Sequence, residues 1–98
     1  MNRYKDLTLR YGDLFDYMAE LFRQYAPTIG FDIPADGFAG EAAGVLSRFD
    51  DINSPDKLAE MMRSIFARRF TGRMAGPSSG YEPIARQFWA VCVNRGLK

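Results

Sequence analysis

Three arginines stand beside a glycine- and serine-rich segment and are the residues best suited to bind an anion. Arg68 and Arg69 precede the segment 71–80, which leads into the start of another expected helix. Arg73 lies inside that segment. Free backbone N–H groups at a helix start attract anions, and glycine lets a ligand approach the backbone closely. The segment lacks the lysine and the preceding strand of a P-loop, and its composition is equally typical of a flexible linker.

The formal net charge of +1 conceals an acidic first half and a basic second half. Residues 1–56 carry five basic and ten acidic side chains, a net charge of −5, whereas residues 57–98 carry eight basic and two acidic ones, a net charge of +6. This asymmetry favours binding to nucleic acid or to an acidic protein, and arginine suits both because it forms paired hydrogen bonds with phosphate or carboxylate. The pI of 7.9 lies below the values above about 9 that are typical of dedicated nucleic-acid-binding domains. Alternatively, the two halves attract each other within one fold.

Two aromatic residues lie off the main apolar stripes of their expected helices. Tyr17 lies off the stripe of the first helix, and Trp89 lies off the Ile84 stripe of the last one. Tyrosine and tryptophan are favoured at partly wet interfaces because each joins a large apolar body to a polar tip. Tyr17 and Trp89 are therefore candidates for a contact surface, with core packing as the alternative.

The residues available for catalysis are few. The chain has no histidine and one cysteine, Cys92, which excludes an intramolecular disulfide, most zinc sites and every catalytic triad that uses imidazole. Cys92 lies in an apolar run and is expected to be a core residue. Asp50 and Asp51 are adjacent but have no metal-ligand spacing, so a small metal-dependent hydrolase is the least favoured function. No cofactor and no metal are expected.

Apolar spacing predicts four helices separated by two long connections. Residues 4–26 carry a stripe with spacings of three and four, ended by Pro27, although Gly12 weakens it. A second helix is expected over 36–49 with Asp36 as N-cap, where glycines four apart indicate tight packing within the domain. The third begins at Ser54 and Pro55 and continues to about residue 70. The fourth begins within 79–83, where Ser79 and Glu82 have the spacing of a capping box, and ends near Asn94 with Gly96 as its cap. The connections are 27–36, where 29–33 could form a short strand, and 71–80.

The sequence predicts a single all-α domain over residues 1–98, a small compact four-helix bundle. A hydrophobic content of 47% with 26% charged residues is that of an ordinary soluble domain, and the lack of a signal sequence or apolar 20-mer predicts a cytoplasmic protein with no membrane partner. The expected function is non-enzymatic binding to a protein or nucleoprotein complex, as in a small regulator or inhibitor, including one encoded by a phage or mobile element. Direct nucleic-acid binding is the alternative, and the stripe of the first helix could also serve a homodimer. The predicted contact residues are Arg63, Arg68, Arg69, Arg73, Arg86, Tyr17 and Trp89.

Overall fold

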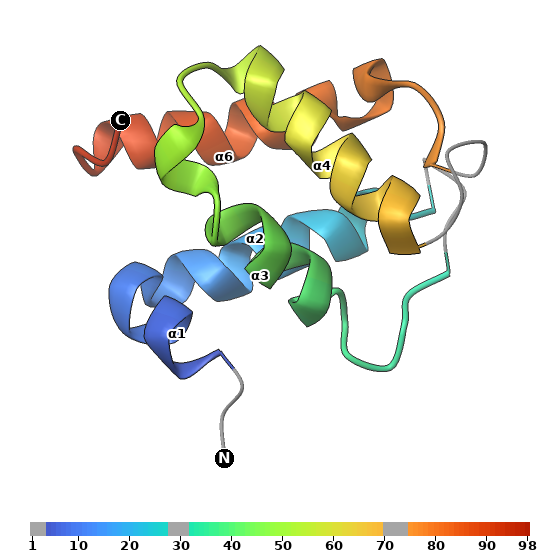
Figure 1. Ribbon diagram of the computed structural model, residues 1–98, viewed down its shortest axis with the longest axis horizontal. Helices are drawn as coiled ribbons and strands as arrows, with labels where there is room; N and C mark the ends of the chain where they lie inside the picture. Colours follow the sequence, from blue (N-terminus) through green and yellow to red (C-terminus); the bar gives the residue numbers. More distant parts are fainter. Residues whose placement is uncertain (1–3, 28–31, 70–74) are drawn as a thin grey trace.

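The computed structural model describes residues 4–27, 32–69 and 75–98, which form five α-helices, two 3-10 helices and no strand. The elements are α1 (Lys5–Tyr11), α2 (Asp13–Tyr25), α3 (Ala39–Leu46), η1 (Phe49–Asp51), α4 (Pro55–Arg69), η2 (Ser78–Tyr81) and α6 (Glu82–Asn94). In Figure 1, α4 and α6 form one packed pair, and α2 with α3 forms the pair facing it. The predicted all-α class is confirmed. The suggested strand at 29–33 falls mainly outside the described residues, and 32–34 form no regular structure.

Gly12 divides the first predicted helix, so the described residues hold five α-helices where the sequence predicted four. Gly12 has φ 57° and ψ −127°, a backbone conformation that residues with a Cβ rarely adopt. Its N–H donates to the Thr8 carbonyl at 2.8 Å and closes α1, and α2 begins at Asp13. The apolar stripe continues across the break, since Tyr11 and Leu14 are both buried. The stripe therefore packs within the domain.

Replacing Gly12 by alanine should lower the free energy of unfolding by about 1 to 3 kcal/mol because of backbone strain. An added Cβ would meet nothing within 4 Å among the described residues, so a steric clash contributes nothing to the loss. Urea denaturation measures the change. Thr8→Ala, at an exposed position of α1, is the control and should shift stability by less than about 0.5 kcal/mol. If the two substitutions lowered stability equally, the positive φ at position 12 would not require glycine.

The second predicted helix is shorter at both ends than the expected 36–49. The prediction of Asp36 as N-cap is wrong, because Phe38 holds that position, although the Asp36 carboxylate accepts the N–H groups of Phe38 at 3.2 Å and Gly40 at 3.1 Å. The bonds close a turn, and α3 begins only at Ala39 because Phe38 has a left-handed φ of 69°. At its other end α3 stops at Leu46, and the chain continues into η1.

The start of α4 agrees with the sequence prediction. The Ser54 hydroxyl accepts the N–H of Lys57 at 3.2 Å, and Pro55 is the first helical residue. Proline suits this position because its missing N–H would have no partner within the helix. The α4 helix therefore begins where its cap predicts, which fixes the direction of the longest helix.

The two ends of α6 differ in how well the sequence predicts them. The predicted capping box of Ser79 and Glu82 is not formed, because residues 78–81 form η2 and no side chain caps the start of α6. The C-terminal prediction is confirmed. Gly96 has φ 76°, its N–H donates to the Val93 carbonyl, and the Leu97 N–H donates to the Cys92 carbonyl, the pattern of a Schellman motif.

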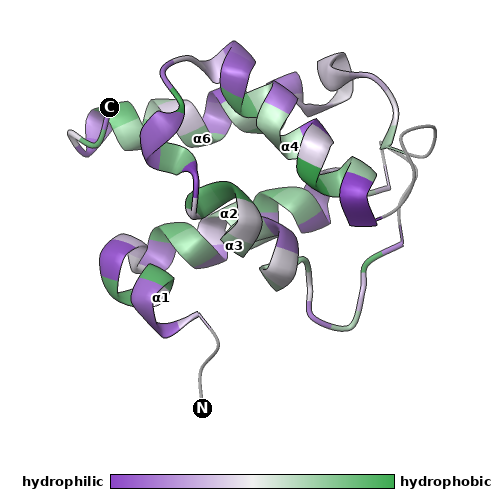
Figure 2. Ribbon diagram, in the orientation of Figure 1, coloured by the Kyte–Doolittle hydropathy of each residue, from purple (hydrophilic) through white to green (hydrophobic). Residues whose placement is uncertain are grey.

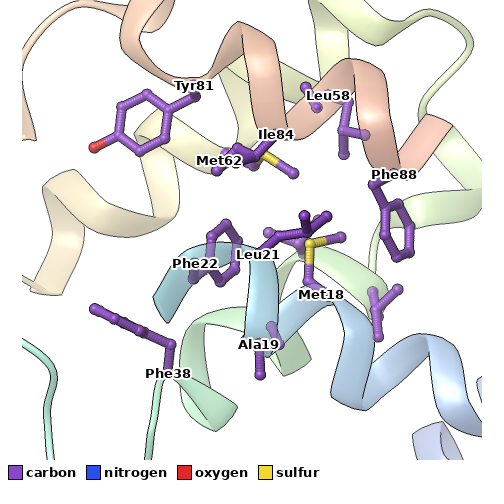
Figure 3. Packing of buried hydrophobic residues seen from close by; sticks show 14 of the residues in the cluster. Met18, Ala19, Leu21, Phe22, Phe38, Leu58, Met62, Tyr81, Ile84 and Phe88 are labelled. Carbon is purple, nitrogen blue, oxygen red and sulfur yellow. The ribbon is translucent and has the colours of Figure 1, made fainter. Parts of the chain in front are cut away.

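The core lies between the two helix pairs. Figure 3 shows that side chains of α2 point toward those of α4 and α6. The labelled residues from the two sides are all buried: Met18, Ala19, Leu21, Phe22 and Phe38 on one side, and Leu58, Met62, Tyr81, Ile84 and Phe88 on the other. The Tyr81 hydroxyl donates to the Ala75 carbonyl at 2.7 Å, and burial raises its pKa to about 12. Cys92 is also buried, which confirms its predicted place in the core, and burial raises its pKa to about 11.

Apolar and polar residues alternate around each helix rather than filling long apolar segments (Figure 2). Within the described part of the chain, no helix has the length and apolar character needed to cross a membrane.

Candidate binding groove between α3 and α4

The α3 and α4 helices pack closely and run in opposite directions. Glu41 near the start of α3 lies beside Arg69 at the end of α4, and Gly44, further along α3, lies beside Ile65, one turn earlier in α4. A Cβ at Gly44 would lie 3.0 Å from the Ile65 Cδ1 atom. The absence of a side chain at Gly44 therefore lets α4 approach, as the prediction of tight packing within the domain requires.

Two hollows lie along α4, the smaller between α3 and α4 and the larger between α4 and residues 48–53, which follow α3. The larger has a volume of about 390 Å³ and the smaller about 300 Å³, and Arg68 lines both. The larger is lined by Arg48, Asp51, Ile52, Asn53, Lys57, Glu60, Met61, Ser64 and Arg68. The smaller is lined by Gly40, Glu41, Gly44, Ile65, Arg68 and Arg69. We call these two hollows together the α3–α4 groove. It follows α4 for about 18 Å, the length of the twelve helical steps from Lys57 to Arg69.

The groove combines paired charges with arginines that have no partner. The Lys57 Nζ atom lies 3.5 Å from the Glu60 Oε2 atom, so these two charges offset each other. Arg48 and Arg68 are both exposed, and neither guanidinium group has an ion-pair or hydrogen-bond partner among the described residues. Figure 2 shows the strongly hydrophilic C-terminal end of α4. The guanidinium groups of Arg48 and Arg68 are thus available to an anionic ligand.

Glu41 is the one buried charged residue in the described part of the chain, with 2% of its side chain exposed. The Arg69 Nε atom lies 3.1 Å from its Oε1 atom, yet neither carboxylate oxygen has a partner with hydrogen-bond geometry. Burial raises the pKa of Glu41 because it disfavours the charged form, whereas the charge of Arg69 acts in the opposite direction. The ion pair holds α3 against α4 but leaves the carboxylate incompletely satisfied.

The raised pKa predicts how stability depends on pH. The folded state holds the Glu41 proton more tightly than the unfolded chain, so the contribution of Glu41 to stability is greatest below its unfolded pKa of about 4.3 and is lost as pH rises through its folded pKa. Glu41→Gln should remove this loss, which amounts to about 1.4 kcal/mol for each unit between the two pKa values. Thermal melts between pH 4 and 7 test the effect. Glu60→Gln, at a glutamate whose side chain is 61% exposed, is the matched control. If the two variants have the same pH dependence, Glu41 does not carry the effect.

The predicted arginines do not form one cluster. Arg68 and Arg69 line the groove. Arg63, on another face of α4, donates from Nε to the Gly76 carbonyl at 2.8 Å and connects α4 to the segment before η2. Arg86 is exposed on α6 and does not line the groove. Arg73 lies outside the described residues.

The two predicted aromatic contacts lie at the margin of the core. The Tyr17 ring stacks on Phe88, with 6.0 Å between ring centroids, and the Trp89 ring meets Phe49 edge-on at 6.1 Å. The Lys98 Nζ atom also lies 5.7 Å from the Trp89 ring centroid. Both aromatics are half-buried and belong to neither hollow of the groove.

Within the described ranges, two ion pairs connect the acidic and basic halves of the chain. Glu41 pairs with Arg69, and Asp13 accepts two hydrogen bonds from the Arg95 guanidinium at 2.7 and 2.9 Å. The Arg95 contact lowers the pKa of Asp13. Attraction between the halves therefore engages some arginines of the basic half, whereas Arg68 and Arg86 have no partner among the described residues.

No group of three or more Asp, Glu, Cys or His side chains in the described ranges is arranged to hold a metal ion. Comparison with family models, with curated proteins and with solved structures found no match for this chain.

Proposed function

We propose that this protein is a non-enzymatic binding protein whose α3–α4 groove receives an acidic segment of a protein partner. The observation that carries the proposal is the position of Arg68, an exposed arginine between two hollows with no partner in the described part of the chain. Arg48 supplies a second such arginine in the larger hollow. Carboxylates suit these groups because guanidinium forms charge-assisted, paired hydrogen bonds with them.

The rest of the groove favours a protein over nucleic acid. Ile52, Met61 and Ile65 line it and can contact apolar side chains, which a phosphate backbone does not offer. Asp51 and Glu60 line the same surface and would repel a row of phosphates. A partner segment with both acidic and apolar side chains complements this mixture. By binding such a segment in the groove, a chain of this size would block other contacts of the partner and so act as a regulator or inhibitor.

Selection from a random peptide display library tests the proposal. Peptides enriched on the wild-type protein should contain acidic residues interspersed with apolar ones, and they should be lost when the target is Arg68→Glu. Arg86→Glu is the matched control, because it makes the same charge change at an exposed arginine outside the groove. Enrichment that is insensitive to Arg68→Glu would contradict the proposal. Binding to unrelated DNA duplexes that weakens steeply with salt would instead assign the arginines to nucleic acid.

A further inference from the structure

The smaller hollow of the α3–α4 groove contains two arginines and one buried carboxylate. Both oxygens of Glu41 are buried and lack a hydrogen-bond donor, and Arg69 provides the neighbouring positive charge. The Arg69 side chain is 47% exposed, so its guanidinium faces both Glu41 and solvent. Arg68 lines the same hollow without a partner among the described residues.

Glycine on α3 makes room for this arrangement. A Cβ at Gly40 would lie 3.5 Å from a terminal nitrogen of Arg69, in ordinary van der Waals contact. Gly40 and Gly44 both line the hollow, so no α3 side chain from these positions fills it. An anionic group of a ligand can therefore reach Arg68 and the exposed side of Arg69 from solvent.

We propose that this hollow binds one carboxylate of the acidic partner segment through Arg68 and Arg69, and that Glu41 takes up a proton from solvent as the carboxylate binds. The inference rests on the proposed function and adds that one proton is taken up for each partner segment bound. No covalent bond forms or breaks except the O–H bond on Glu41.

Electrostatics couples the two events. Glu41 is already costly to ionise because burial disfavours its charged form and the neighbouring Arg69 offsets this only in part. A ligand carboxylate adds a second negative charge beside it and competes for the charge of Arg69, and both effects raise the pKa of Glu41. The charged and titratable groups around it are Arg68 and Arg69 from α4, Asp36 from the turn before α3, Tyr4 ahead of α1, and Arg23 of α2 through its bond to the Gly37 carbonyl.

A carbon-13 NMR titration measures this coupling. The wild-type protein is labelled in its glutamate side-chain carboxyl carbons, and the Glu41 signal is identified by its absence in Glu41→Gln. The probe is an unlabelled eight-residue peptide of alternating glutamate and leucine with acetylated and amidated ends, called the glutamate–leucine peptide, because the groove is lined by both charged and apolar side chains. At saturating peptide, the pKa of Glu41 should rise by about one unit or more. Proton linkage then requires affinity to increase more between pH 7.5 and 5.5 in the wild type than in Glu41→Gln, with an upper limit of about tenfold for each unit by which the pKa of Glu41 rises.

The outcomes separate this inference from the proposed function. A peptide that binds the groove while the pKa of Glu41 stays constant or falls would overturn the proton coupling and leave the binding function standing. An equal pH dependence in the wild type and Glu41→Gln would do the same. A peptide that does not bind the wild type at either pH would overturn both.

Discussion

Replacing Phe66 by alanine should lower the free energy of unfolding by about 3 to 5 kcal/mol. Phe66 is fully buried on α4, and among the described residues its ring meets three aromatic rings from other parts of the chain. The centroids of Phe22, Phe38 and Tyr81 lie at 5.1, 5.5 and 5.5 Å from that of Phe66. The substitution removes contacts that connect α4 to α2, to the turn before α3 and to η2, and it leaves a cavity where four elements meet.

Equilibrium denaturation in urea measures this loss. Phe66→Leu keeps most of the apolar volume and should cost clearly less than alanine. Arg86→Ala, on the exposed side of α6, should change the free energy of unfolding by less than about 0.5 kcal/mol. A loss below about 1 kcal/mol for Phe66→Ala would mean that this ring is not a centre of the core.

The second large effect is expected in binding. Arg68→Glu should weaken binding of an acidic peptide by about 2 to 4 kcal/mol, because a charge-assisted hydrogen bond contributes about 1.5 to 3 kcal/mol and a repulsive charge replaces it. Titration calorimetry with the glutamate–leucine peptide measures the change. Arg48→Glu should have an effect of the same sign, because Arg48 lines the larger hollow.

Arg86→Glu shows whether affinity depends on a contact made by Arg68 or on the net charge of the protein. It changes the net charge by the same amount as Arg68→Glu, but Arg86 lies outside the groove. Its effect on affinity should therefore be small and should disappear as added salt screens it. Folding should be unaffected in both variants, since neither arginine has a partner among the described residues. Equal losses of affinity in the two variants would indicate binding governed by total charge.

Local capping rules and apolar spacing predict much of the fold. Ser54 and Pro55 fix the start of α4, and Gly96 ends α6, because each acts through its immediate neighbours. Gly12 and Phe38 are different. Both take positive φ values that break or delay a helix, and a glycine within an apolar stripe does not reveal whether the helix bends or ends there. The apolar pattern predicts which residues are buried better than where helices begin.

The candidate site is less predictable because it depends on contacts between distant residues. The polar face of α4, with Lys57, Ser64 and Arg68, follows from helical spacing. Arg48, just before η1, lines the same hollow as that face only because the chain folds back after α3, and no local pattern indicates it. Arg69 and Arg63 have the same residue type as Arg68, but the fold engages them with Glu41 and the Gly76 carbonyl. Residue type thus identifies the candidate arginines, and the contacts that each makes in the fold decide which of them can bind a ligand.

The most direct test of the binding function is to locate the peptide on the protein by NMR. Addition of the glutamate–leucine peptide to nitrogen-15-labelled protein should shift the backbone amide signals of the groove, including those of Arg48, Met61, Ile65 and Arg68. It should leave the exposed face of α6 around Arg86 unchanged. The shifts should saturate with one peptide per protein and should be lost in Arg68→Glu. Shifts centred on α6, or spread evenly over all exposed arginines, would contradict the assignment of the α3–α4 groove as the binding site.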